Sequence, residues 1–151
     1  MIKIEIATEK DLSRILEIEK GSISPIWPEG ALLVEINKEG SYFVVAVDES
    51  ASHIVGYAVL RQVGYDGELQ QIAVDESARR SGVGDLMMDA VLKHADIKSF
   101  ESVFLEVRYR NTAAVRLYEK HGFRTVRVRK NYYENPVEDA LVMSRGRGIF
   151  K

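Results

Sequence analysis

The fold is decided by residues 71–86, which read QIAVDESARRSGVGDL. A buried-type strand ends near Asp75, a short basic loop follows, and an apolar face with helical spacing begins directly after Gly84. This order points backbone N–H groups and a helix N-terminus at one place. Such an arrangement favours an anionic ligand, a phosphate or a pyrophosphate.

Four residues of this loop supply the chemistry of the anion hypothesis. Gly82 and Gly84 would let the backbone approach a ligand closely and tolerate positive φ, and Arg79 and Arg80 would add charge-assisted hydrogen bonds. The alternative is an ordinary strand-to-helix turn that uses glycine. Two common phosphate loops are excluded, because no Lys follows Gly84 and Met87 stands where a dinucleotide fingerprint needs a third glycine.

The rest of the chain is typical of an α/β (α+β) protein. Alternation and turn residues predict strands at 2–6, 42–48, 53–62, 68–75, 103–107, 123–129 and 139–144. Helices are expected after a capping box at Thr8 and Asp11, over 29–37, after Gly84 and after Asn111. The order β-α-α-β-β-β-α-β-α-β-β predicts a mixed, mostly antiparallel sheet of about seven strands with helices on both faces, and residues 1–151 read as one domain. The third helix should bury one apolar face, formed by Leu86, Met87, Ala90, Val91 and His94.

Composition excludes several function classes. The 151 residues contain no cysteine, so disulfides and thiolate chemistry are excluded, and the three histidines lack metal-ligand spacing, so no metal is expected. No apolar run approaches the ~20 residues of a membrane span, and the N-terminus does not read as a signal peptide. We therefore expect a cytoplasmic protein without membrane contact.

Charge is distributed unevenly along the chain. Residues 1–50 carry five basic and ten acidic side chains, whereas residues 108–130 carry eight basic side chains and one acid. A basic segment in a chain of net charge −2 indicates either a local anionic ligand or a solvated basic face. With a pI near 6.0 and no recognition motif, direct binding of nucleic acid is not expected.

Two motifs together carry a family resemblance. The loop R-x-x-G-x-G at 79–84 is followed at 111–123 by NTAAVRLYEKHGF, and the pair resembles the GNAT superfamily of N-acetyltransferases. Within it, LEVR at 105–108, KNYY at 130–133 and EDA at 138–140 are similar to the bacterial ribosomal-protein alanine N-acetyltransferases (RimI-like). The resemblance is strong from 69 to 143. The segment SPIWP at 24–28 is a looser version of the family's F-P-W segment, with a shifted Trp.

This resemblance implies a GNAT fold, acetyl-CoA as co-substrate and a role for each matching residue. The backbone of Ile72, Ala73 and Val74 would bind the pantetheine arm. The pyrophosphate would be surrounded by six residues with Arg79 at their edge: Arg80, Ser81, Gly82, Val83, Gly84 and Asp85. Asn111 and Tyr118 would contact the cofactor, Glu106 would be the general base, and Tyr118 would be the general acid.

The chemistry supports these roles, although alternatives stay open. An attacking amine must lose a proton and a departing thiolate needs one, so a carboxylate and a phenol are suitable groups. Tyr118 is otherwise a core residue, Glu106 is otherwise an ion-pair partner of Arg108 or Arg116, and Glu68 is a rival base. The favoured choice is Glu106 with Tyr118. Two further residues, Tyr132 and Tyr133, either line the acceptor groove or pack at a strand end.

The favoured function is transfer of acetyl from acetyl-CoA to a protein N-terminal α-amine. An α-amine with a pKa near ~8 is easier to deprotonate than a lysine near ~10.4, so a modest base suffices. One alternative acceptor is a small amine such as an amino acid, a polyamine or an antibiotic. Another alternative is a non-catalytic acetyl-CoA-sensing module, which would need neither Glu106 nor Tyr118. The protein is expected to be a monomer or a homodimer.

Overall fold

The computed structural model describes residues 1–21 and 27–146, so residues 24–26 of the SPIWP segment lie outside the described part. One sheet has the strand order β1-β2-β3-β4-β5-β7-β6, in which only β4 and β5 are parallel. This confirms the predicted mixed, mostly antiparallel sheet. The strands are β1 (Ile2–Ile6), β2 (Ser41–Asp48), β3 (His53–Val63), β4 (Asp66–Val74), β5 (Ser102–Arg108), β6 (Arg124–Tyr133) and β7 (Glu138–Gly146).

Four α-helices lie among the described residues, in the predicted places. They are α1 (Leu12–Lys20), α2 (Glu29–Ile36), α3 (Val83–Ile97) and α4 (Thr112–Lys120). Before α1, the Thr8 N–H donates to the Asp11 carboxylate at 2.9 Å. At α4 the Asn111 side chain accepts from the Ala114 N–H at 3.3 Å, and Gly122, with φ +91°, follows the helix. None of these helices is both long and apolar enough to cross a membrane.

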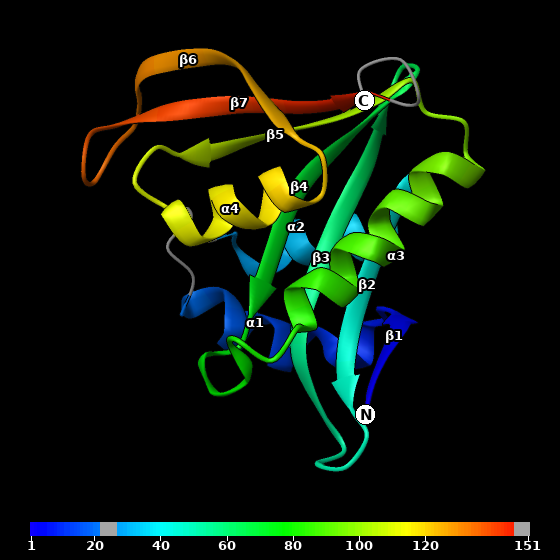
Figure 1. Cartoon of the computed structure of the whole chain (residues 1–151). Helices are drawn as coiled ribbons and strands as arrows, with labels where there is room; N and C mark the ends of the chain where they lie inside the picture. The colour runs from blue at the N-terminus through cyan, green and yellow to red at the C-terminus, as the bar shows by residue number, and fades with distance from the viewer. Residues whose placement is uncertain (22–26, 147–151) are drawn as a thin grey trace.

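The helices cover both faces of the sheet. In Figure 1, α3 and α4 lie in front of the strands and α1 and α2 lie behind them. The α3/α4 face buries a core that includes Leu105, Tyr118 and Met143. The α1/α2 face buries a separate core that includes Ile15, Leu32 and Tyr57. The sheet therefore carries a separate hydrophobic core on each of its two faces.

The buried face of α3 differs from the prediction at Leu86. That side chain is 42% exposed, and the helix instead buries Met87, Met88, Val91, Leu92 and Ala95. The reason is that α3 contacts four neighbouring strands, β1 to β4, so its buried face is broader and is rotated past Leu86. His94 is half-buried and stacks on the Tyr42 ring, with ring centroids 3.9 Å apart.

The two parallel strands separate soon after they meet. The register between β4 and β5 contains only Gly67 with Val103 and Glu68 with Phe104. Beyond these pairs the strands diverge, as Figure 1 shows. Within residues 1–21 and 27–146, the β5-facing edge of β4 therefore has no strand partner after Glu68, and its backbone groups can pair with another partner.

A bulge in β4 changes which side chains share a face. The register passes from Val59 with Gln71 to Leu60 with Leu69, so Gln70 is the extra residue. Leu69 packs in the α3/α4 core, whereas Gln71 contacts Glu19 of α1 on the opposite face. Without the bulge, alternation would put Leu69 and Gln71 on the same face. The bulge thus brings Gln71 to the α1/α2 side, where Glu68 also lies.

Candidate active site

A cleft of about 640 Å³ lies beside the gap between β4 and β5. Its lining comes from three places, the segment before α2, the two diverging strands and the end of β6: Trp27, Glu68, Leu69, Gln70, Gln71, Glu106, Tyr132, Tyr133, Glu134 and Asn135. Both carboxylates predicted as candidate bases are among these residues. A larger hollow of about 990 Å³, between α3 and the α4–β6 connection, contains none of the predicted site residues.

Glu106 is held in the cleft by two contacts from β6. One carboxylate oxygen lies 3.0 Å from Nε of Arg129, and the other accepts a hydrogen bond from the Tyr132 hydroxyl at 3.2 Å. The alternative that Glu106 pairs with Arg108 or Arg116 named the wrong partners, since its ion pair is with Arg129. β7 lies between β5 and β6, so Arg129 of β6 reaches Glu106 across β7, whereas Arg108 pairs with Glu138.

Glu68 lies in the same cleft as Glu106. It is the register partner of Phe104, two residues before Glu106, so the two carboxylates project from the same face of neighbouring strands. Its side chain accepts a hydrogen bond from Gln70 Nε2 at 2.5 Å. The fold thus brings both candidate bases to one site, where Glu106 forms an ion pair with Arg129 and Glu68 lies opposite Arg61 of β3, whose pKa it helps to raise.

Tyr118 lies on the other face of the sheet, in the α3/α4 core. It is 7% exposed and packs against Phe123 in the α3/α4 core, with ring centroids 5.9 Å apart. Burial raises the pKa of the Tyr118 phenol, and the nearby Tyr133 acts in the same direction. Core packing and proton donation are therefore compatible, because the phenol stays protonated at neutral pH.

The start of α3 presents backbone N–H groups that precede the first hydrogen bond of the helix. Gly82 has φ +85° and precedes the first helical residue, Val83, without a side-chain cap. The first backbone hydrogen bond of the helix runs from Leu86 N–H to the Gly82 carbonyl at 3.1 Å, so the N–H groups before it have no helical acceptor. A Cβ at Gly82 would meet no atom within 4 Å. The site is open, and its donors suit a pyrophosphate.

The positive φ that was expected at Gly84 is not found, and the residue has a packing role. It lies within the first turn of α3, its φ is not positive, and a Cβ there would stand 3.3 Å from the Leu117 side chain. Glycine at this position therefore lets α4 pack closely on α3.

Asp85, the next residue, pairs with His121 at 2.8 Å and Lys120 at 3.1 Å, and these contacts lower the pKa of Asp85.

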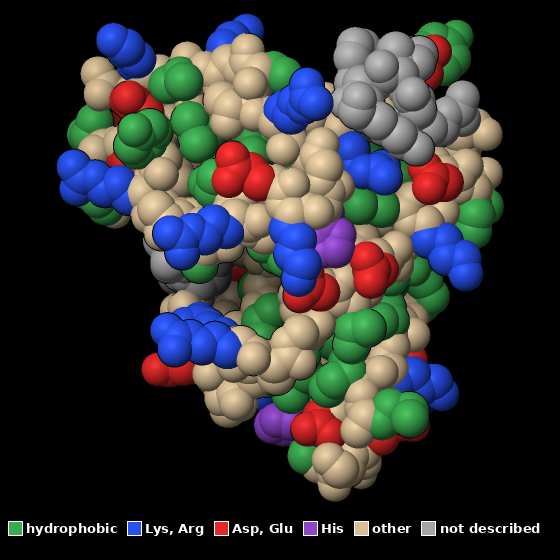
Figure 2. Space-filling model, viewed as in Figure 1, with side chains coloured by type: hydrophobic (Ala, Val, Ile, Leu, Met, Phe, Trp, Pro, Cys, Tyr) green, Lys and Arg blue, Asp and Glu red, His purple; other side chains and the backbone are tan. Residues whose placement is uncertain are grey.

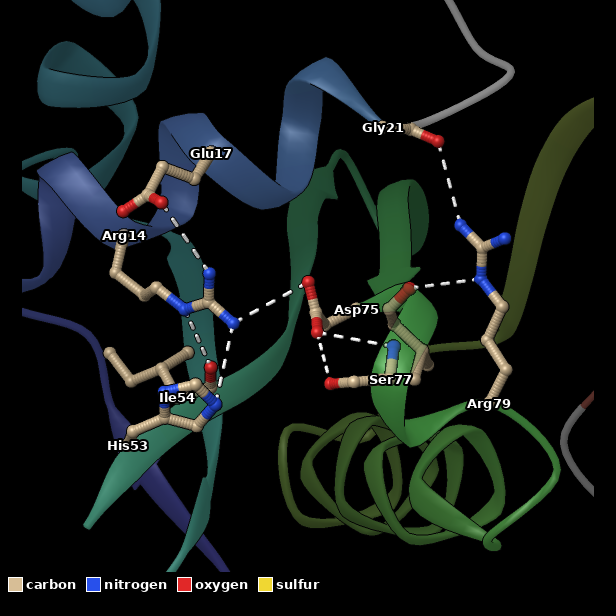
Figure 3. A network of polar contacts seen from close by, with 9 residues as sticks. Arg14, Glu17, Gly21, His53, Ile54, Asp75, Ser77 and Arg79 are labelled. Atoms are coloured by element: carbon tan, nitrogen blue, oxygen red, sulfur yellow. Dashed lines mark hydrogen bonds and ion pairs between the residues drawn. The ribbon is translucent and has the colours of Figure 1, made fainter. Parts of the chain in front are cut away.

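The two arginines of the loop have different surroundings. Arg79 donates from Nε to the Val74 carbonyl at 3.3 Å and from Nη2 to the Gly21 carbonyl at 3.5 Å, as Figure 3 shows. It therefore ties the loop to the ends of β4 and α1. The Arg80 backbone has φ +65°, and its guanidinium makes no hydrogen bond or ion pair with the described part of the chain. Arg80 is thus the side chain that a ligand can recruit.

A second set of contacts in Figure 3 fixes the end of β4. Arg14 of α1 donates to the Ile54 carbonyl at 2.9 Å, and its Nη2 lies 3.4 Å from Asp75 Oδ1. The other Asp75 oxygen accepts from the Ser77 N–H at 3.3 Å. Figure 2 shows Lys and Arg side chains on both sides of a hollow between α4 and the start of α3. The loop is therefore anchored, and its surroundings are basic.

The exposed edge of β4 directs alternate residues into the gap. The Asp75 N–H donates to the Val55 carbonyl of β3 at 2.7 Å, and the Ala73 carbonyl also points toward β3. Along a strand, the N–H and C=O groups of successive residues point to opposite edges. Those of Ile72 and Val74 therefore point away from β3, into the gap between β4 and β5. Two of the three predicted backbone positions thus face the opening.

Asn111 lies at the start of α4, where its side chain caps the helix by accepting from the Ala114 N–H.

Two charged residues that shape the cleft were not expected from the sequence. Arg108 donates to the Glu134 and Pro136 carbonyls, each at 3.2 Å, and holds the tip of the β6–β7 hairpin against the cleft. Glu19 of α1 is fully buried and accepts from the Tyr57 hydroxyl and, at 3.3 Å, from Gln71 Nε2. The only signal for Glu19 is a charged residue on the apolar face of α1. Burial raises the pKa of Glu19 to about 7.

In residues 1–21 and 27–146, no group of three or more His, Cys, Asp or Glu side chains could hold a metal ion. The residues around the gap are instead carboxylates, phenols and backbone donors. These groups can move a proton and bind an anion.

The comparisons with known proteins agree with this geometry. The profile of the acetyltransferase (GNAT) family matches residues 12–123. The ribosomal protein bS18-alanine N-acetyltransferase of Haemophilus ducreyi is 29% identical over 93% of this chain and 97% of its own length. Among solved structures, the ribosomal-protein-S18-alanine N-acetyltransferase of Escherichia coli superposes with a TM-score of 0.88 at 26% identity, covering 97% of this chain and 94% of that one. Ard1 of Thermoplasma volcanium gives 0.87 at 30% identity, covering 96% and 97%.

The chain therefore belongs to the acetyltransferase (GNAT) family. It is an N-acetyltransferase that uses acetyl-CoA as co-substrate and acetylates a primary amine, which confirms the predicted enzyme class. The solved relatives also confirm the expected GNAT fold.

Proposed function

We propose that the acceptor is the α-amine of a protein N-terminus and that it binds in the cleft on the α1/α2 face. The observation that carries this proposal is the cleft beside the diverging strands β4 and β5, which holds Glu106 on the α1/α2 face, while Tyr118 lies in the core of the opposite face. The names of the relatives support it, since several act on the alanine of a ribosomal protein or on α-amines. The carboxylates of Glu68 and Glu106 suit a cationic acceptor.

Acetyl-CoA would bind on the α3/α4 face. The backbone of Ile72 and Val74 would pair with the pantetheine arm at the free edge of β4. The pyrophosphate would lie on the N–H groups at Gly82 to Asp85, with Arg80 recruited and Arg79 at the edge. Acetyl-CoA supplies the acetyl group as an activated thioester, and the chain's part is to orient it and exclude water.

Two side chains would move protons during the transfer. Glu106 would accept the proton of the attacking amine, directly or through a water molecule, on the cleft side of the gap. Tyr118, whose pKa is raised by burial, would protonate the departing thiolate from the opposite side. Glu68 is the alternative base. We favour Glu106 because Arg129 and Tyr132 together fix its orientation.

The acceptor is tested by measuring thiol release from acetyl-CoA with a panel of amines. The panel contains peptides with free N-termini, the same peptides with blocked N-termini and an internal lysine, and free amino acids and polyamines. We expect turnover of the free N-termini. Turnover of small amines without turnover of peptides would replace the protein acceptor by a small one. That the chain acts as one domain, as a monomer or homodimer and without nucleic acid, stays a prediction.

Gly82→Asp is expected to weaken acetyl-CoA binding at least tenfold, about 1.4 kcal/mol. The substitution puts a side chain at φ +85° and a negative charge beside the proposed phosphate position. Calorimetry with acetyl-CoA measures the effect. The matched control is Gly64→Asp, since Gly64 also has positive φ, +61°, and open space around its Cα, but lies in the β3–β4 turn. Equal affinities of the two folded variants would contradict the pyrophosphate assignment.

A further inference from the structure

One buried carboxylate lies directly behind the cleft. Glu19 stands near the end of α1 and is fully buried, although the apolar core on this face would accept a hydrophobic side chain there. An unpaired buried charge is costly. The residues that Glu19 contacts should therefore explain why a carboxylate is buried at this position.

Glu19 joins three separate parts of the chain. It accepts hydrogen bonds from the Tyr57 hydroxyl of β3, from Gln71 Nε2 of β4 at 3.3 Å, and from the backbone N–H of Trp27. All three partners donate, which suits an ionised carboxylate because it only accepts. In the described part of the chain, Tyr57 is the only other titratable group that contacts it.

Two of these partners form one side of the cleft. Trp27 and Gln71 both line it, and Gln71 reaches this face because of the bulge at Gln70. Glu19 itself has no exposed surface, so it acts through them. Displacing Glu19 would remove one hydrogen-bond acceptor from the Trp27 backbone and one from the Gln71 amide at the same time.

We propose that Glu19 is a positioning residue for the acceptor, which fixes Trp27 and Gln71 as one wall of the cleft and so determines how tightly the acceptor binds. This rests on the proposed function, in that the cleft receives the acceptor. The residue belongs to neither the acetyl-CoA side nor the proton-transfer pair. Its loss should affect acceptor binding alone.

The first test compares Glu19→Gln with Glu35→Gln in steady-state kinetics. An amide at position 19 keeps the size of the side chain but turns one acceptor into a donor, which opposes the donors around it. We expect KM for the best peptide of the panel to rise at least tenfold, kcat to change less than about threefold, and acetyl-CoA affinity to stay the same. Glu35 is the matched control, since it is also a buried helix carboxylate on this face, paired with Arg61, but does not line the cleft.

An equal KM in wild type and Glu19→Gln, or the same KM change in both variants, would overturn the proposal. In that case, an equal loss of folding stability in Glu19→Gln and Glu35→Gln would show that Glu19 has a structural role only. If wild type turns over no peptide, the proposed acceptor fails, and the second test still decides the positioning role.

The second test uses fluorescence, because Trp27 is the only tryptophan of the chain. Burial raises the pKa of Glu19 to about 7, so the emission of wild type should titrate with a midpoint near pH 7. The titration should vanish in Glu19→Gln and persist in Glu35→Gln. If Glu19→Gln does not fold, Tyr57→Phe replaces it and should move the midpoint upward, since it removes a donor to the charged form. An unchanged titration in the folded variant would contradict the proposal.

Discussion

Tyr118→Phe is expected to lower kcat by about 10²–10⁴-fold and to leave acetyl-CoA affinity nearly unchanged. The substitution keeps the ring and its packing against Phe123 and removes only the proton. The effect falls on kcat because the departing thiolate needs that proton in the transition state and not before it. Steady-state kinetics together with calorimetric titration of acetyl-CoA separates the two quantities.

Tyr42→Phe is the matched control for this experiment. Tyr42 is also a tyrosine whose pKa is raised by burial and whose ring packs against a helix, but it contacts His94 of α3, far along the sheet from the cleft. We expect its variant to keep wild-type kcat. A Tyr118→Phe enzyme with full rate would show that the phenol serves only to fill the core.

Glu106→Gln is expected to lower kcat by a similar factor, about 10²–10⁴-fold, and to flatten the lower limb of the pH–rate profile. That limb records ionisation of the base, and an amide has no such ionisation. The amide keeps the length of the side chain and still accepts from the Tyr132 hydroxyl. The measurement is kcat as a function of pH at saturating acetyl-CoA and peptide.

Two further variants show whether the loss of kcat in Glu106→Gln comes from loss of the general base. Glu68→Gln tests the rival base of the same cleft, and Arg129→Gln removes the ion pair while keeping the Glu106 carboxylate. We expect smaller losses from both. A crippled Glu68→Gln enzyme beside a nearly wild-type Glu106→Gln enzyme would make Glu68 the base. Full rates in both Tyr118→Phe and Glu106→Gln would mean that positioning of the substrates alone drives the transfer.

Local patterns were sufficient to predict most of the fold. The alternation at 2–6 gives β1, the Thr8 and Asn111 caps mark the starts of α1 and α4, and glycine follows α4 at Gly122. Each of these signals acts within a few residues of itself, so the sequence carries it directly. The family resemblance pointed to Glu106 as a site residue and left open whether Tyr132 and Tyr133 line a groove, and all three line the cleft.

The remaining features depend on residues far apart in the chain. Arg129 reaches Glu106 only because β7 lies between β5 and β6, and Arg108 reaches Glu134 only through the hairpin tip. The bulge at Gln70 decides the face of Gln71, and a one-residue register change has no local pattern. The role of Gly84 depended similarly on Leu117 of another helix. The hydrophobic pattern within a single helix or strand does not show which distant residues it will contact.

The sheet separates the proposed acceptor cleft from the proposed acetyl-CoA site, and this separation affects how the choice of acceptor can evolve. In the proposed arrangement, substitutions around Trp27, in α1 and at the β6–β7 hairpin would reshape recognition of the acceptor, while the loop at 79–85 and α3 would keep the binding of acetyl-CoA. A new acceptor would then be acquired by selection without changes in the residues that bind the common donor. Because Glu19 and Arg108 each hold several recognition elements at once, we expect evolutionary changes of acceptor to involve these anchor residues together with the surface that they support.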